Sequence, residues 1–199
     1  ILRCVECDLK FYAPPIIGDA RFYDSISKHD WYYNSNKWEF DVVLRHLQNS
    51  GKTKNLLEVG SGAGFFLEKA AKFFEQVEGV ELNPNAVKIA RAKGLAVSDT
   101  DFFKLSKTYD AVVSFQVIEH VEQPGTMLKG MVERLNSGGK LVVVVPNQDG
   151  FLGRLHHNYL NMPPHRLTLR SKKPFEYISD HFGVRMISYE TEPFSIEMY

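Results

Sequence analysis

The sequence is short of cysteine, of net charge and of long apolar runs. Only two of its 199 residues are cysteines, so no disulfide framework can form, and we expect a reducing, cytoplasmic setting. The 24 lysine and arginine residues equal the 24 aspartate and glutamate residues, which argues against tight binding to a nucleic-acid backbone. The longest aliphatic run, Leu141 to Val145, is too short to cross a bilayer, so we expect no membrane partner.

The amino-terminal residues have no charged-then-apolar signal pattern. The chain does not begin with methionine, so we expect it to be an excerpt of a longer sequence. Cys4 and Cys7 have the C-x-x-C spacing of half a structural zinc site, which needs four ligands. The seven histidines are too scattered to complete it, and the adjacent His156 and His157 have no suitably spaced acidic partner. We therefore favour a chain without bound metal.

The first 36 residues differ in texture from the rest. They are rich in aromatic residues and are broken by Pro14, Pro15 and Gly18, which indicates an extended arm followed by short helical turns. After them, short apolar runs alternate with amphipathic stretches. We therefore divide the chain into an arm, residues 1–36, and a domain, residues 37–199.

The domain has the pattern of an α/β fold. Strands are predicted over 55–59, 76–81, 96–98, 111–115 and 140–145, and helices over 37–48, 65–74, 85–93, 126–135 and 173–181. Strands that alternate with helices indicate a parallel sheet covered on both faces. The segment 184–199 predicts one or two antiparallel strands.

A glycine loop follows the first of these strands. Gly60, Gly62 and Gly64 permit positive φ and a close approach of a ligand to the backbone. The helix after them would present free N–H groups to a negative group. A dinucleotide-binding G-x-G-x-x-G loop needs its third glycine at position 65, which is Phe65. The pattern here is acid-x-G-x-G-x-G, with Glu58 as the acid.

Five motifs in order resemble those of the class I S-adenosylmethionine-dependent methyltransferases, over about residues 37 to 190. They are residues 58–64 as the first motif, 79–83 as a second strand ending in an acid, 98–99 as the third-strand acid, 109–113 with 117–121 as the fourth strand and its "EHV" loop, and 135–141 as the entry to strand five. The resemblance implies a Rossmann-like, doubly wound, mostly parallel sheet of seven strands. The C-x-x-C arm and residues 163–167 further resemble a subgroup that acts on sugars, polyketide-like compounds or other small metabolites.

The same resemblance implies S-adenosylmethionine as cofactor and S-adenosylhomocysteine as product. Glu81 would accept the ribose hydroxyls, Asp99 the adenine amino group, and Glu58 would face the ammonium group or anchor the loop. The other expected cofactor contacts are Gly60, Ser61, Gly62, Gly64, Phe65, Leu82, Thr100, Phe115, Gln116 and Tyr33. For Glu81 and Asp99 the alternative is that they are solvated acids at strand ends. Trp31 to Tyr33 would form a lid or, alternatively, pack the arm onto the domain.

Methyl transfer from a sulfonium is an in-line displacement that depends chiefly on orientation. A base is needed only when the acceptor must lose a proton. His120 and His165 are the candidates for catalytic residues, because imidazole titrates near neutrality. The alternative is that His120 hydrogen-bonds its own loop and His165 anchors a rigid turn.

The predicted function is methyl transfer to a small-molecule acceptor such as a sugar or a quinol-like compound. The alternative is a catalytically silent module that binds the cofactor. An NAD-dependent oxidoreductase explains Gly60 and Glu81 but not Phe65 or the Glu119-His120 block. Methylation of nucleic acid is disfavoured by the neutral charge and by the lack of an Asn-Pro-Pro-aromatic motif.

Overall fold

The computed structural model describes residues 1–26, 29, 34–49, 51, 53–150, 159–169 and 171–193. The chain divides into two compact units, each treated by itself below. The sheet unit comprises Asp19–Val117 and Gly125–Val144, and the arm unit comprises Ile1–Gly18, Ile118–Pro124 and Val145–Tyr199. The predicted arm, residues 1–36, is thus shared between the two units, and its separation from a domain at residue 36 stays a prediction.

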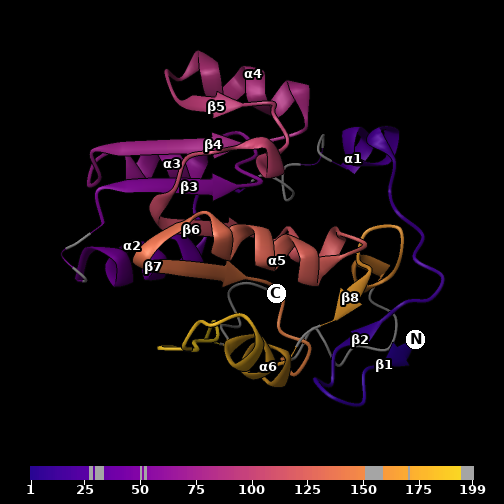
Figure 1. Cartoon of the computed structure of the whole chain (residues 1–199). Coiled ribbons are helices and arrows are strands. Elements are labelled where there is room, and N and C mark those ends of the chain that lie inside the picture. The colour runs from indigo at the N-terminus through magenta and orange to yellow at the C-terminus, as the bar shows by residue number, and fades with distance from the viewer. Residues whose placement is uncertain are drawn as a thin grey trace. The chain divides into compact units, whose positions relative to one another are not determined.

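Five parallel strands form the centre of the sheet unit. In chain order they are β3 (Asn55–Val59), β4 (Gln76–Val80), β5 (Ala96–Ser98), β6 (Tyr109–Phe115) and β7 (Leu135–Val144). Their order across the sheet is β5-β4-β3-β6-β7, and every neighbouring pair is parallel (Figure 1). The order reverses between β3 and β6. In open parallel sheets such a switch point leaves a crevice at the carboxyl ends of the strands, where ligands bind.

Helices cover both faces of this sheet. Those of the sheet unit are α1 (Ala20–Ile26), α2 (Trp38–Asn49), α3 (Phe65–Ala70), α4 (Pro84–Ala92) and α5 (Pro124–Glu133). Apolar residues of α2, α3 and α4 pack with Leu56, Ala111 and Val113 in one core cluster. The buried residues of α5 are not members of that cluster. In Figure 1, α5 lies in front of β6 and β7, on the near face of the sheet. The predicted α/β fold with a parallel sheet is therefore confirmed.

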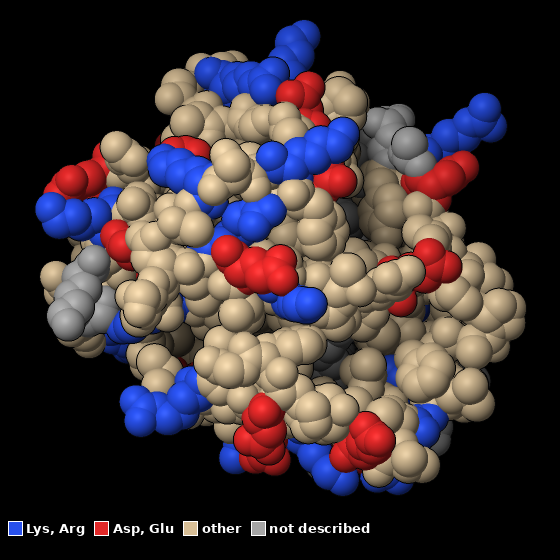
Figure 2. Space-filling model, in the orientation of Figure 1, with Lys and Arg blue, Asp and Glu red and all other residues tan. Residues whose placement is uncertain are grey.

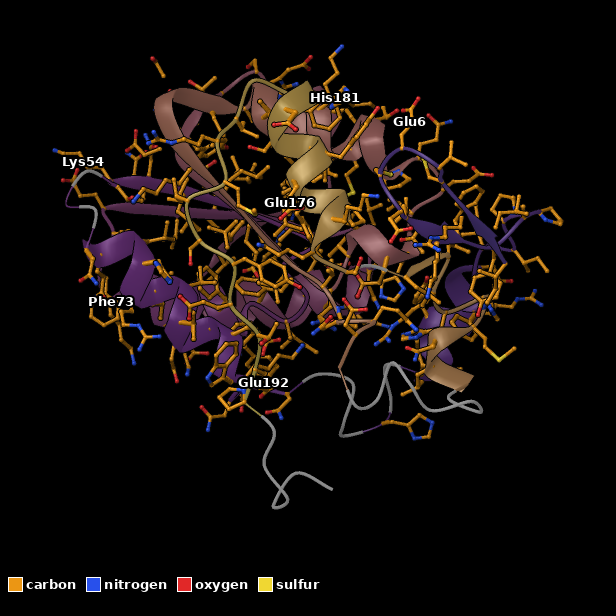
Figure 3. The ribbon with its side chains drawn as sticks, turned by 90° about the horizontal axis from the view of Figure 1, so that it is seen from below. Glu6, Lys54, Phe73, Glu176, His181 and Glu192 are labelled. Atoms are coloured by element: carbon orange, nitrogen blue, oxygen red, sulfur yellow. The ribbon has the colours of Figure 1, made fainter. Side chains whose placement is uncertain are left out.

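The arm unit contains a small antiparallel sheet that the sequence pattern did not predict. Its strands are β1 (Leu2–Arg3), β2 (Lys10–Phe11) and β8 (Thr168–Leu169), in the order β1-β2-β8. Phe11 pairs with Thr168 and Lys10 with Leu169, so two segments distant in sequence form one sheet. The unit also contains the α-helix α6 (Lys173–His181). The hydroxyl group of Tyr177 on this helix donates a hydrogen bond to Glu6 at 2.9 Å, and Glu6 is labelled in Figure 3.

Most element boundaries lie within two residues of the sequence prediction, with three larger differences. Strand β7 begins at Leu135 rather than at residue 140. Its pairing with β6 has an irregularity at this point, because Tyr109 pairs with Leu135 whereas Ala111 pairs with Lys140. Helix α3 ends at Ala70 rather than at residue 74. Residues 184–193 form no strand, and the remaining residues of the predicted terminal hairpin lie outside the described part of the chain. The described residues thus contain five parallel and three short antiparallel strands, and a seven-stranded sheet stays a prediction.

The charged side chains form no single-sign surface on the face drawn in Figure 2, where lysine and arginine lie among aspartate and glutamate. Within the described ranges, no helix is both long and apolar enough to span a membrane. The same ranges hold no cluster of three or more histidine, cysteine, aspartate or glutamate side chains that could bind a metal ion. Cys4 and Cys7 are both free thiols.

Candidate functional site

The glycine loop of the sheet unit is tied to the carboxyl end of β4. The backbone N–H groups of Gly60 and Ser61 both donate to the carbonyl oxygen of Val80, at 2.8 and 3.1 Å. Gly60 has φ +77°, and a Cβ atom there would lie 2.3 Å from a methyl group of Val117. Gly62 and Gly64 also have positive φ. Backbone conformation and close packing therefore both require glycine at position 60.

Glu81 joins this loop to the segment that follows β4. Its Oε2 accepts from the N–H of Gly62 at 2.8 Å, and its Oε1 accepts from the N–H of Asn83 at 2.7 Å. The backbone N–H of Glu81 donates to Ser98 at the end of β5. Each carboxylate oxygen can accept a second hydrogen bond. Glu81 therefore holds the loop in place and keeps acceptor capacity for hydroxyl groups of a ligand.

Glu58, near the end of β3, and Ser61, in the glycine loop, each have a buried polar atom without a hydrogen-bond partner in the described part of the chain. Their relative exposures are 3% and 5%, and neither Glu58 Oε2 nor Ser61 Oγ has a hydrogen-bond partner among the described residues. Burial, reinforced by the charge of Glu81, raises the pKa of Glu58 well above its usual range, and Lys37 opposes this shift. Buried polar atoms are almost always hydrogen-bonded. Each of these two atoms could therefore accept a hydrogen bond from a donor that a bound ligand would bring.

Three of the predicted cofactor contacts, Leu82, Asp99 and Thr100, follow the ends of β4 and β5. Leu82 is 74% exposed directly after Glu81. The Asp99 carboxylate is also exposed and pairs with Arg91 at 3.2 Å. The N–H of Thr100, expected to face a ring nitrogen, donates to Ser98 Oγ at 3.1 Å. A ligand that used Thr100 would therefore replace an exposed local hydrogen bond.

Three further predicted contacts are held in place by the protein itself. Phe115 is buried, with its ring 4.9 Å from that of Phe40 within the core cluster. Phe65 packs against the same cluster and has Lys93 Nζ 4.0 Å from its ring centre. Gln116 has φ +55°, and its N–H donates to Val144 at 2.8 Å. The contacts of these residues with a cofactor stay predictions. The predicted lid, 31–33, including the cofactor candidate Tyr33, lies outside the described residues.

The two candidate catalytic histidines lie side by side in the arm unit. The rings of His120 and His165 are 4.6 Å apart. His120 Nδ1 contacts the carbonyl oxygen of His165, and His165 Nδ1 contacts that of Leu160 at 3.0 Å. Because a carbonyl oxygen only accepts, each Nδ1 carries a proton, so a neutral form of either ring has its lone pair on Nε2. Burial lowers the pKa of His165, which favours this neutral form.

Two charged residues beside these rings, the buried Glu119 and the partly buried Arg166, were not predicted. Glu119 is 1% exposed, and His120 Nε2 lies 3.8 Å from its Oε1. Arg166 hydrogen-bonds Asn161 Oδ1, and burial lowers its pKa against the opposing effect of Glu119. The signal for Glu119 was present in the "EHV" motif, whereas nothing in the sequence indicated that Arg166 would be partly buried.

A separate cavity of about 280 Å³ opens in the sheet unit. It is lined mainly by apolar residues of β3, β4 and β5, together with Tyr109, whose hydroxyl donates to Glu78 at 2.9 Å. None of the predicted cofactor or catalytic residues lines it. This cavity is therefore distinct from the glycine loop.

The chain is similar in sequence to several named methyltransferases. A ubiquinone biosynthesis O-methyltransferase of Xanthomonas oryzae is 28% identical over 138 residues, covering 64% of this chain and 57% of that protein. A mitochondrial enzyme of the same name from Schizosaccharomyces pombe is 26% identical over 55% of this chain and 44% of that protein. The chain thus spans about half the length of these relatives.

Among solved structures, the SAM-bound amino pentose methyltransferase CalS10 of Micromonospora echinaspora is 26% identical, with a TM-score of 0.56. The match covers 69% of this chain and 60% of that one. The sugar N-methyltransferase KedS8 of Streptoalloteichus, at 22% identity and a TM-score of 0.57, shares the fold over 75% of this chain and 61% of its own. The family model described as a methyltransferase domain matches residues 31–188, so the chain belongs to the methyltransferase domain family.

Proposed function

We propose that this chain binds S-adenosylmethionine at the glycine loop and transfers its methyl group to a small-molecule acceptor. Membership of the methyltransferase domain family supports the reaction class. The observation that carries the proposal is the buried Glu58 carboxylate, whose Oε2 lacks a partner among the described residues beside a loop with three positive-φ glycines. The α-ammonium group of the cofactor is a charged donor that would satisfy this atom.

Each part of the cofactor has a matching group in the sheet unit. Glu58 would take the ammonium, with Ser61 beside it, and the backbone of the loop would lie against the methionine portion. Glu81 would accept the ribose hydroxyls with its remaining lone pairs. Leu82 would cover one face of the adenine, and Asp99 would accept from its amino group. Gly60, Gly64, Phe65, Thr100, Phe115, Gln116 and Tyr33 complete the proposed cofactor set.

The bound cofactor would supply an already activated methyl group. The protein then has to hold the acceptor in line with that methyl and, for a hydroxyl acceptor, remove its proton. We assign the proton to His165, because its Nδ1 is fixed by Leu160 and burial keeps Nε2 unprotonated. His120, beside the buried Glu119, would position it and serves as the second candidate.

The acceptor is proposed to be a small molecule with a hydroxyl group. The ubiquinone biosynthesis O-methyltransferases among the relatives support this class of acceptor. The amino pentose named for CalS10 supports an amino group as the second class to be examined. An amine in its free-base form needs no residue to remove a proton before attack, so the two classes would depend differently on His165.

Two measurements test the proposal in sequence. Calorimetry should show binding of S-adenosylhomocysteine and none of NADH, and binding of NADH alone would refute it. The chain is then incubated with methyl-labelled S-adenosylmethionine and panels of phenols, quinols and amino sugars. Label in a product supports the enzyme, whereas cofactor binding without transfer to any panel member would favour the catalytically silent module.

A further inference from the structure

We propose that cofactor binding at the glycine loop expels one proton from Glu58, so that the affinity for cofactor rises with pH. This inference rests on the proposed function, because it concerns the same loop and the same ligand. It adds a step that the cofactor contacts alone do not imply. The carboxyl group of Glu58 is neutral while the loop is empty and becomes a carboxylate when the ligand ammonium arrives.

The surroundings of Glu58 disfavour a charge in the empty protein. The residue lies in the middle of three parallel strands, where its pairing partners are Gly79 on β4 and Val113 on β6, neither of which can ionise. Its relative exposure is 3%, so water does not solvate the group. One carboxyl oxygen of Glu58, Oε2, has no hydrogen-bond partner among the described residues. A buried charge that is incompletely hydrogen-bonded is costly, so burial favours the protonated form of the group.

Two charged residues act on Glu58 from outside its own strand. Glu81, after β4, repels a second negative charge, and Lys37, before α2, attracts one. Burial and Glu81 together outweigh Lys37, so the pKa of Glu58 is raised. Glu81 cannot easily turn away, because both of its carboxylate oxygens are held by backbone N–H groups. The repulsion is therefore a fixed property of the loop.

The ligand reverses this balance by bringing the positive charge of its protonated α-amino group. An ammonium next to Oε2 stabilises the carboxylate by attraction and by a charge-assisted hydrogen bond. The balanced step is neutral Glu58 plus ligand ammonium giving a carboxylate–ammonium pair, with one proton released to solvent. Between the pKa of Glu58 in the complex and that in the empty protein, Kd should fall about tenfold per pH unit.

The experiment measures protons directly. Binding of S-adenosylhomocysteine is followed by calorimetry at one pH in two buffers, phosphate and Tris, that differ in ionisation enthalpy. We expect the two binding enthalpies to differ by the amount that corresponds to close to one proton released. The control ligand is 5′-methylthioadenosine, which keeps the adenosine and the sulfur but lacks the ammonium, and it should bind with no release. Equal proton release by both ligands would overturn the inference.

Variants locate the proton. Glu58→Gln cannot ionise, so it should bind S-adenosylhomocysteine without proton release and without the tenfold pH dependence. Glu68→Gln removes an exposed carboxylate on α3 and should behave as the wild type. If Glu58→Gln still releases the proton, the assignment to Glu58 is wrong. If it fails to fold, the wild-type buffer comparison still decides.

The two proposals fail in different ways. Binding of S-adenosylhomocysteine with no proton release at any pH from 6 to 9 overturns this inference and leaves the proposed function intact. No binding at all refutes the proposed function itself.

Discussion

The carboxylate of Glu81 accepts a hydrogen bond from the backbone N–H of Gly62 at 2.8 Å. This contact joins the residue after β4 to the loop that leaves β3. The side chain expected to bind ribose is therefore also a support of the loop that approaches the ligand. One acid residue links loop geometry to ligand recognition, and its replacement should affect both.

Replacing Glu81 separates these two tasks. Glu81→Gln keeps an oxygen for one of the two backbone donors but loses the charge, and Glu81→Ala removes both acceptors. We expect the affinity for S-adenosylhomocysteine to fall by about 1 kcal/mol or more in Glu81→Ala, the scale of a lost hydrogen bond to a charged group, and by less in Glu81→Gln. Calorimetry measures both. Affinity unchanged in Glu81→Ala would count against a ribose contact.

Gly60 can be compared with a matched glycine elsewhere in the same unit. Gly60 and Gly94 have nearly equal φ, +77° and +78°, but a Cβ at 60 meets Val117 whereas a Cβ at 94 meets nothing within 4 Å. Gly94→Ala should therefore show the backbone cost alone, about 1 kcal/mol. Gly60→Ala should lower the free energy of unfolding by a further 1–3 kcal/mol or so, the usual cost of overpacking. Urea titrations of the two variants test the difference, and equal losses would contradict the close packing.

At Leu82, an effect on ligand binding can be measured without a large change in the free energy of unfolding. Because its side chain is 74% exposed, Leu82→Ala should change the free energy of unfolding by less than about 0.5 kcal/mol. Loss of apolar contact with adenine should nevertheless weaken binding of S-adenosylhomocysteine by about 1 kcal/mol. Phe73→Ala is the control, since Phe73, labelled in Figure 3, is also exposed and is not one of the proposed cofactor residues. A similar affinity of the two variants would remove Leu82 from the cofactor set.

Glu58 should make stability depend on pH in a definite direction. A carboxyl group whose pKa is raised on folding stabilises the folded state fully below its unfolded pKa, and this contribution is lost as pH rises through the folded value. Without ligand, Glu58→Gln should match the wild type near pH 4. At pH 8 it should be more stable by about 1 kcal/mol or more, because wild-type Glu58 is ionised in the unfolded chain and must bind a proton or bury its charge on folding, whereas glutamine does neither. Thermal or urea unfolding at both pH values measures the difference, and a wild type that is the more stable at pH 8 would show that the carboxylate is stabilised.

His165 should matter for one class of acceptor more than another. With a hydroxyl acceptor, His165→Gln should reduce kcat by about 100-fold or more, the lower range for loss of a general base. Binding of S-adenosylhomocysteine should not change. Because burial lowers the pKa of His165, kcat/KM of the wild type should hold down to pH values below the usual imidazole pKa of about 6.5 before it falls. A variant with full activity on hydroxyl acceptors would assign His165 to the structural role of anchoring its turn.

The sequence alone determined the parallel sheet and the position of its loop. The strands β3 and β5 and the helix α6 have the predicted bounds. Such elements can be located from the sequence because a local run or period of apolar residues marks where each begins and ends. The glycines at 60, 62 and 64 likewise need positive φ for local reasons. Patterns of this kind are complete within a few neighbouring residues.

Only the tertiary structure decided how distant residues meet. The two-residue strands β2 and β8 are too short for any periodicity, and their pairing joins Phe11 to Thr168. That Glu81 holds Gly62, and that Glu119 is buried beside His120, depends on where the chain returns after intervening helices and loops. Residue spacing indicates which groups are present at the ends of strands. The hydrogen bonds, burial and charge that set their chemistry arise from packing, which a local pattern does not encode.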